Sequence, residues 1–159
     1  MIDKFNGVHR FLSNFYPSPI EFEGDQYPAV EHAYQAAKTD NPNNRYAISI
    51  SKASDAKAMG RNLKTREDWE EVKLEIMKRL LLKKFRDPVL RQQLVDTGTE
   101  ILVEGNYWHD NFWGKCACAR PECSNTGKNW LGELLMQIRE DISYKIAKEV
   151  EIATISQEA

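Results

Sequence analysis

The 159-residue sequence predicts an α+β fold, a compact and mostly helical single domain with a few short strands. Segments with apolar residues at helical spacing cover most of the chain, whereas segments with β character are few and short. Hydrophobic residues make up 42% and charged residues 29%, which is typical of a globular chain of one domain. We expect the domain to span 1–148 and residues 149–159 to form a frayed tail.

The first third of the chain predicts a hairpin and two helices. Residues 20–23 and 26–27 flank Gly24-Asp25, which is typical of a hairpin with a tight turn. The stretch 29–39 is rich in helix formers and ends before Asn41-Pro42, because a residue before proline avoids helical backbone. A second helix is predicted over 52–59 and is expected to close at Gly60.

The longest helix is expected over 65–85, with Thr65 as its N-cap. Its apolar residues keep to one helical stripe: Trp69, Val72, Ile76, Met77, Leu80, Leu81 and Phe85. A place on this stripe favours a core position for Trp69 over a ligand contact. Asp87-Pro88 ends the helix and opens another, which stops at Gly98.

The last third combines a long loop with a terminal helix. Residues 101–103 predict a short buried strand, and 104–128 predict a polar and aromatic loop of a length that is usually functional or disordered. Asn129 is placed to cap the last helix. The apolar face of that helix consists of Leu131, Leu134, Leu135, Ile138 and Ile142.

Composition excludes several classes of protein. A net charge of −2 and a pI near 6.0 argue against stable binding to the phosphate backbone of nucleic acid, although an enzyme that visits a nucleotide remains open. No apolar run approaches the roughly 20 residues that cross a bilayer, and the first residues lack the apolar stretch of a signal peptide. Three cysteines do not build a secreted disulfide framework. We therefore expect a cytoplasmic protein without a membrane partner.

The predicted helix over 29–39 carries the first candidate site. Glu31, Tyr34, Gln35 and Lys38 are spaced i, i+3, i+4 and i+7, so they share one face. A solvated face with a Glu–Lys pair is one interpretation. A pocket wall in which an acid and an amine perform acid/base or covalent chemistry is the other, and the Asn/Ser-rich aromatic loop before the helix favours it.

The second candidate is the polar and aromatic segment 106–114. Tyr107, Trp108, Phe112 and Trp113 stand among Asn, His and Asp residues, which suits a stacking platform for a base. The alternative is a loop whose aromatic side chains fill the core. The two interpretations have similar weight.

Cys116, Cys118 and Cys123, with His109 upstream, form the third candidate. Three thiols and one imidazole supply four tetrahedral zinc ligands, but the spacing lacks the paired CxxC motifs of common zinc sites. The sequence favours free cysteines in a reducing compartment, and we expect no cofactor. A structural zinc site remains the alternative.

A fourth candidate is an anion site. Gly127-Lys128-Asn129 precedes the last helix, and N–H groups at a helix N-terminus bind phosphate, although the spacing is not that of a P-loop. Arg61, with Lys57 and Lys64, supplies positive charge for a phosphate. Solvated basic residues are the alternative.

Several motifs together resemble the NADAR (YbiA-like) family. The opening FLSNFYPSPIEFEGDQYPAVEHAYQAAK is followed, in the family's order, by AKAMGR, DWEEVKLEIMKRLLLKKF, FWG and GKNWLGELLMQIR. The resemblance covers residues 5–142. One departure stands after the FWG motif, where KCACARPECSNT replaces a short glycine-rich stretch.

The resemblance implies a compact, mostly helical α+β fold and an N-glycosidase that hydrolyses a ribose C1–N bond. The implied substrate is ADP-ribose on the guanine amino group of nucleic acid or a phosphorylated intermediate of riboflavin biosynthesis. The implied catalytic residues are Glu31, Lys38 and Asp110. The resemblance also implies site positions at Asn14, Trp69 and Asn129, and with these we expect the substrate to be bound by Phe15, Tyr34, Gln35, Arg61, Trp113 and Gly114.

The chemistry of the reaction suits these residue types. A carboxylate beside C1 stabilises an oxocarbenium-like centre, and aromatic faces hold a base. Two other classes of function stay open: a non-catalytic module that binds a nucleotide or ADP-ribose, and a small protein whose cysteine cluster holds structural zinc.

Overall fold

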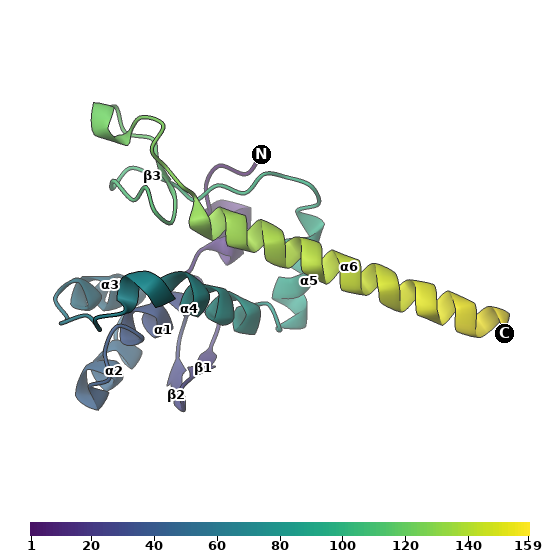
Figure 1. Cartoon of the computed structure of the whole chain (residues 1–159), viewed down its shortest axis with the longest axis horizontal. Coiled ribbons are helices and arrows are strands. Elements are labelled where there is room, and N and C mark those ends of the chain that lie inside the picture. The colour runs from purple at the N-terminus through teal and green to yellow at the C-terminus, as the bar shows by residue number, and fades with distance from the viewer. The chain divides into compact units, whose positions relative to one another are not determined.

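The computed structural model describes residues 1–159 and confirms a mostly helical α+β protein (Figure 1). The chain has six α-helices, two 3₁₀-helices and four very short strands, and the strands stand in two consecutive pairs. The chain divides into two compact units, Asn6–Asp87 and a unit built from Met1–Phe5 with Pro88–Ala159. No helix has both the length and the apolar character to span a bilayer.

The unit Asn6–Asp87 begins with η1 (Gly7–Leu12) and the hairpin of β1 (Ile20–Phe22) and β2 (Asp25–Tyr27). The strands pair antiparallel with Ile20 opposite Tyr27, which confirms the predicted hairpin. Its two-residue turn is Glu23-Gly24, one position earlier than predicted, because both residues take the left-handed conformation that such turns need. Asp25 belongs to β2.

Four helices follow in this unit: α1 (Val30–Ala36), α2 (Pro42–Ser49), α3 (Ala53–Arg61) and α4 (Trp69–Lys84). α1 packs against each of the other three. Every residue of α1 is buried, so it forms the centre of this unit. The other buried apolar side chains include Phe11, Leu12, Phe22, Tyr27, Ile48, Met77, Leu80 and Leu81.

Three helix boundaries in this unit differ from the prediction. α1 ends at Ala36, before the predicted end at residue 39, and Asn41-Pro42 begins a helix of its own, because the Asn41 side chain caps α2 and Pro42 occupies its first turn. Gly60 does not end α3 but lies within it. α4 starts at Trp69 and not at Thr65, where a bidentate ion pair between Arg66 and Asp68 holds the preceding turn.

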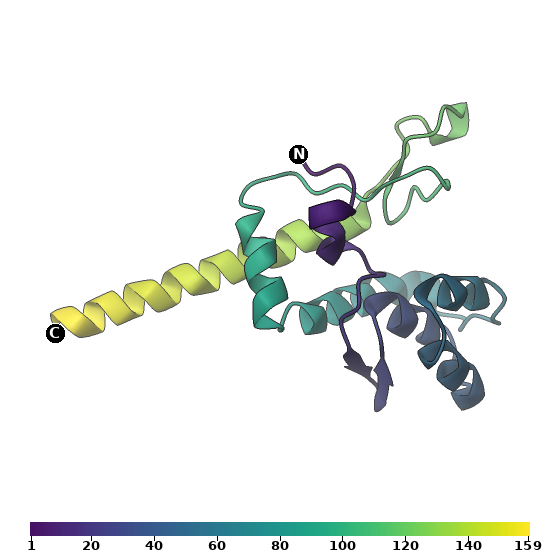
Figure 2. The same cartoon turned by 180° about the vertical axis from the view of Figure 1, so that it is seen from behind.

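The second unit contains α5 (Pro88–Asp96), β3 (Gly105–Asn106), β4 (Lys115–Cys116), η2 (Pro121–Cys123) and α6 (Trp130–Glu158). The predicted strand over 101–103 is reduced to one isolated parallel bridge between Ile2 and Leu102, because no neighbouring strand continues the pairing. β3 and β4 pair in parallel inside the predicted long loop. Figure 2 shows η2 at the tip of the arm that leads away from this strand pair.

Helix α6, and not α4, is the longest helix, with 29 residues against 16. It passes α5 and continues as one rod to Glu158, where we expected a frayed tail after Lys148 (Figure 1). Residues 147–159 are exposed, so the helix there depends on intrinsic propensity, and the segment contains no glycine or proline to stop it. The buried side of α6 comprises Leu131, Leu135 and Ile138, while Leu134 and Ile142 are half-buried.

Candidate active site

Helix α1 brings four predicted site residues onto one buried face. Glu31, Tyr34 and Gln35 are exposed by only 7%, 6% and 4%, and Lys38 just after the helix is half-buried. This burial excludes the solvated-face alternative. Packing of α1 against α2, α3 and α4 gives the short helix its stability, because seven residues are too few for an isolated helix.

Glu31 is a buried acid with one defined hydrogen bond. Burial is the main cause that raises the pKa of its carboxyl group above 4.5. A hydrogen bond of 2.7 Å from Gln35 Nε2 to Glu31 Oε1 and the charges of Lys57 and Lys38 oppose that rise without cancelling it. Glu31 therefore holds a proton at higher pH than an exposed glutamate does.

Lys38 lies beside an aromatic pair. Its Nζ is 5.6 Å from the centre of the Tyr34 ring and 5.8 Å from that of Trp69, and the two rings are 5.0 Å apart. Burial lowers the pKa of Lys38 below 10.5, the Glu31 carboxylate opposes this, and Lys57, Lys73 and Arg61 lower it further. The acid and the amine are thus perturbed in opposite directions, which is common at catalytic sites.

Three further cations act on Lys38. Lys57 and the exposed Arg61 come from α3, and Lys73 comes from α4. The sequence predicts Lys57 and Arg61 as phosphate ligands but does not single out Lys73. Its position one helical turn after Trp69 is the signal that could have found it. Lys64, the third predicted cation, is exposed.

The loop before the hairpin also reaches α1. The carbonyl oxygen of Asn14 accepts a hydrogen bond of 3.0 Å from the Glu31 backbone N–H, at the unbonded first turn of the helix. Asn14 is buried, and its side-chain Oδ1 has no hydrogen-bond partner. Phe15 is partly exposed, and Lys57 Nζ lies 5.9 Å from the centre of its ring. A buried acceptor without a donor suits a ligand that brings one.

Gly60 determines the position of the Gln35 side chain. A Cβ atom at Gly60 would lie 1.7 Å from Gln35 Oε1 and 2.5 Å from Gln35 Cδ. We expect Gly60→Ala to displace the amide that bonds Glu31 and to destabilise the fold by about 1–3 kcal/mol. Urea unfolding of Gly60→Ala, Gln35→Ala and the double variant tests this. The steric account requires the second substitution to cost less in the Gly60→Ala background, and additive losses would contradict it.

His32, the remaining polar residue of α1, points away from this face. Its Nε2 lies 2.9 Å from the Ser51 carbonyl oxygen, to which the ring donates a hydrogen bond. This contact ties α1 to the start of α3 and gives His32 a structural role.

Four of the residues predicted to act in catalysis or substrate binding belong to the other unit. Asp110, Trp113 and Gly114 lie in one loop, and Asn129 directly precedes α6. Asp110 Oδ1 accepts hydrogen bonds from the backbone N–H groups of Phe112 (3.0 Å) and Trp113 (2.9 Å). Asn106 fixes Asp110 through both of its backbone polar groups. One carboxylate oxygen of Asp110 is thus occupied by the turn, which leaves Oδ2 outside these bonds.

The aromatic residues of this loop do not fill the core. Tyr107 and Trp108 are 58% and 57% exposed, and Phe112 and Trp113 are half-buried with their rings edge to face, 4.8 Å apart. The core-filling alternative is therefore wrong for the first two. Gly114 has a packing role, because a Cβ there would lie 2.1 Å from the Glu104 carbonyl oxygen.

The predicted phosphate site at the start of α6 is not available. The backbone N–H groups of residues 128, 129, 130 and 131 donate to the carbonyl oxygens of Asn111, Gly114, Phe112 and Trp113, respectively. Asn129 stands at the N-cap position but does not cap the helix with its side chain. Its amide instead donates to the Leu102 carbonyl (2.9 Å) and accepts from the Glu104 N–H (3.0 Å).

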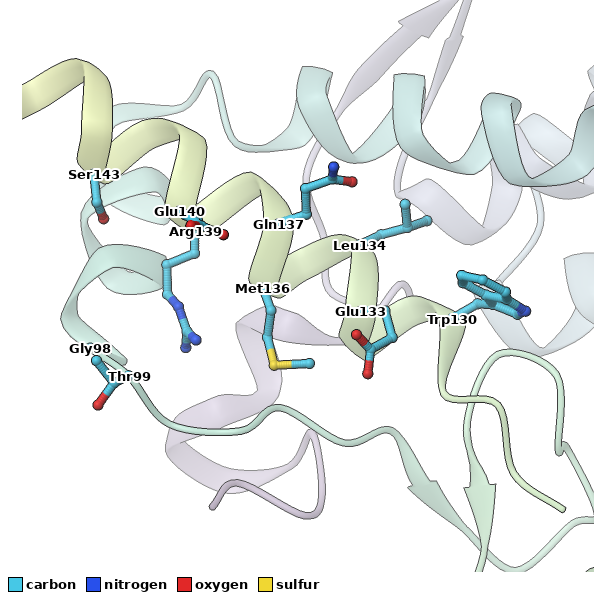
Figure 3. Close-up of a pocket in the computed structure, with 10 residues that line it drawn as sticks. All are labelled: Gly98, Thr99, Trp130, Glu133, Leu134, Met136, Gln137, Arg139, Glu140 and Ser143. Carbon is cyan, nitrogen blue, oxygen red and sulfur yellow. The ribbon is translucent and has the colours of Figure 1, made fainter. Parts of the chain in front are cut away.

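This unit holds two further features, a group of metal-ligand residues and a cavity. His109, Cys116, Cys118 and Cys123 bring four metal-ligand atoms within 4.8 Å of one another. A cavity of about 700 Å³ lies along the first half of α6 and is closed on one side by Gly98 and Thr99 (Figure 3). Arg139, the basic residue that lines this cavity, donates hydrogen bonds to the Thr97 hydroxyl and the Glu100 carbonyl. The cavity therefore has no lysine paired with a buried acid like the pair on α1.

Comparison with known proteins identifies the family. The NADAR domain family model matches residues 4–143. An N-glycosidase of Nostoc punctiforme is 38% identical over 138 residues, which cover 82% of this chain and 84% of that protein. N-glycosidase YbiA of Escherichia coli is 36% identical over 140 residues, covering 83% and 81%. A riboflavin biosynthesis protein of Vibrio vulnificus is 34% identical, but the match covers only 36% of its length.

A solved structure agrees with these matches. The NMR structure of E. coli YbiA has a TM-score of 0.75 and 32% sequence identity to this chain, and covers 92% of this chain and 89% of its own. The resemblance inferred from the motifs is confirmed, as is the predicted fold. The chain belongs to the NADAR domain family.

Proposed function

We propose that the chain is an N-glycosidase that hydrolyses the bond between C1 of a ribosyl group and a nitrogen. The observation that carries the proposal is the pair of Glu31 and Lys38, whose pKa values are shifted toward neutrality from opposite sides by burial. The names of the relatives from Nostoc punctiforme and E. coli support the same reaction.

Glu31 acts as the acid and then the base in this proposal. Its raised pKa lets the carboxyl group donate a proton to the departing nitrogen, which makes the amine a better leaving group. The resulting carboxylate stabilises positive charge at C1, because burial strengthens its field. Gln35 keeps the carboxyl oriented through the bond to Oε1.

Lys38 acts as the nucleophile. Its lowered pKa increases the fraction of neutral amine, and Nζ can attack C1 as the C1–N bond to the leaving group breaks. The new ammonium passes a proton to the Glu31 carboxylate, ring opening leaves an imine between Nζ and C1 with the ring oxygen protonated, and water hydrolyses the imine to the phosphorylated sugar and regenerates the amine. A lysine can also act as a fixed cation that holds a phosphate or hydroxyl group, and borohydride trapping separates the two roles.

The cations around the pair favour a phosphorylated substrate. Lys57, Arg61 and Lys73 come from two helices and act on the same amine, so their positive fields overlap at Lys38. Tyr34 and Trp69 offer ring faces beside it. Within this class we propose two substrates, ADP-ribose on the guanine amino group of nucleic acid and a phosphorylated intermediate of riboflavin biosynthesis.

The test is direct incubation with both substrates. The full chain is mixed with an ADP-ribosylated guanine oligonucleotide or with the phosphorylated ribosylamine, and mass spectrometry detects the released ribosyl product and amine. Release from either compound supports the proposal and identifies the substrate. Tight binding of both compounds without cleavage would instead support the alternative of a nucleotide-binding module.

Trp113 is expected to contribute to substrate binding as a stacking partner. Loss of one stacked ring costs about 1–3 kcal/mol, so Trp113→Ala should raise the dissociation constant roughly 5- to 150-fold. Isothermal titration with a non-cleaved substrate analogue measures this. Trp108→Ala is the matched control, because that ring is exposed in the same loop. Wild-type affinity in Trp113→Ala would remove this residue from the site.

A further inference from the structure

The side chains of His109, Cys116, Cys118 and Cys123 form a compact cluster that the proposed reaction does not use. His109 Nδ1 lies 3.4 Å from Cys123 Sγ, 3.4 Å from Cys118 Sγ and 3.7 Å from Cys116 Sγ. All four ligand atoms lie within 4.8 Å of one another. All three cysteines are free.

Hydrogen bonding does not account for this arrangement. One imidazole nitrogen carries either one proton or one lone pair, so Nδ1 forms one good hydrogen bond and not three. A single disulfide would pair two of the sulfurs and leave the third. A central cation, in contrast, satisfies all four atoms at once.

The distances fit a tetrahedral zinc ion. Zinc bonds of about 2.3 Å to sulfur and about 2.0–2.1 Å to nitrogen, at a tetrahedral angle, separate nitrogen from sulfur by about 3.5 Å. The three observed separations, 3.4, 3.4 and 3.7 Å, lie around this value. Three thiolates and one imidazole are also the ligand types that favour Zn²⁺ over hard cations such as Mg²⁺ or Ca²⁺.

The segment 107–128, which carries the cluster, has little buried core to hold its conformation. Among residues 107–128 only Gly114 and Cys123 are buried, so this 22-residue segment has almost no apolar core. His109 has a φ of 71°, a left-handed conformation that a non-glycine residue adopts at a cost unless other contacts hold it. Metal bonds supply such contacts where a core is missing.

We propose that His109, Cys116, Cys118 and Cys123 bind one Zn²⁺ ion in a closed structural site. Four protein ligands leave no open position for water, so the ion holds the loop and takes no part in the chemistry. The ligands His109 and Cys116 bracket residues 110–115, which include Asp110 and Trp113. Zinc binding therefore fixes the part of the loop that we assign to substrate contact.

The experiment uses the full chain purified without chelator. We expect about one zinc per chain by mass spectrometry of the metal, and replacement by Co²⁺ should give thiolate charge-transfer bands with the visible bands of a tetrahedral site. Cys118→Ser and His109→Ala should lose most of the metal and the cobalt spectrum. Ser124→Ala, an exposed neighbour of Cys123, should keep both.

Stability and thiol protection give readouts that do not depend on activity. Chelation should lower the melting temperature and expose three thiols to alkylation, and added zinc should reverse both changes. A chain that contains no zinc, whose three thiols react equally with and without added Zn²⁺, would overturn the proposal. Because none of these measurements involves a substrate, their failure would leave the N-glycosidase proposal untouched.

Discussion

Glu31→Gln is expected to lower the turnover number about 10²- to 10⁴-fold while the chain folds normally. Glutamine has nearly the same volume and still accepts the hydrogen bond that Gln35 Nε2 gives to Oε1 in the wild type. It neither donates a proton to the leaving nitrogen nor carries the charge that stabilises C1. Single-turnover rates on the cleaved substrate measure the effect, with Glu75→Gln, an exposed residue of α4, as the matched control.

The same substitution should not cost stability at neutral pH. The folded-state pKa of Glu31 is above 4.5, so the folded chain binds this proton more tightly than the unfolded chain does. That stabilisation is complete below the unfolded pKa and is lost as pH rises through the raised pKa. Above the raised pKa the wild type therefore bears the burial of a charge that Glu31→Gln lacks.

Unfolding in urea at a series of pH values checks the direction in which the stability difference between Glu31→Gln and the wild type changes with pH. We expect Glu31→Gln to be at least as stable as the wild type at neutral pH and to lose less stability as the pH rises above 4.5. Near-normal turnover in a folded Glu31→Gln variant would contradict the catalytic assignment and favour a binding module. Loss of folding in the variant would show that the carboxyl group has a structural role.

Spacing predicted the face of α1 but not its burial. The i, i+3, i+4 and i+7 positions of Glu31, Tyr34, Gln35 and Lys38 follow from helix geometry alone. Whether such a face meets solvent depends on α3 and α4, which reach it from later in the chain. Local periodicity carries no information on that packing, so the solvated and the buried interpretations had to stay open.

The predictions of helix boundaries were wrong where one residue type can serve two structural purposes. Proline ends a helix before it and also begins one, and Pro42 begins α2, whereas α1 already ends at Ala36. Glycine is common after a helix but also lies inside one where another side chain needs the space, as Gln35 does above Gly60. The tertiary contact decides between these uses.

The predicted phosphate site at the start of α6 was also wrong because of a tertiary contact. A glycine-rich approach to a helix N-terminus is typical of phosphate binding. Here the loop of residues 111–114 supplies the acceptors, because its carbonyl oxygens bond the N–H groups of residues 128–131. The family's FWG and GKN motifs are therefore joined by backbone hydrogen bonds, which no pattern in either motif indicates.

Lys38→Arg is expected to abolish trapping and to lower turnover by about 10³-fold or more. Arginine keeps a long stem and a positive charge, but its guanidinium stays protonated and does not form an imine. With borohydride present during turnover, the wild type should gain a reduced ribosyl adduct on Lys38, which peptide mass spectrometry locates. Lys64→Arg, an exposed lysine of the same unit, is the control and should behave as the wild type.

The pH profile separates the nucleophile from a fixed cation. The neutral amine attacks C1, so in Glu31→Gln, where no carboxyl group titrates beside it, the residual rate should rise with pH through the lowered pKa of Lys38, below 10.5. A cation that only attracts phosphate acts in the protonated form, and its contribution would fall over the same range. If Lys38→Arg retains turnover and the wild type gives no adduct, Lys38 holds the substrate by charge, and Glu31 alone carries the proton transfer.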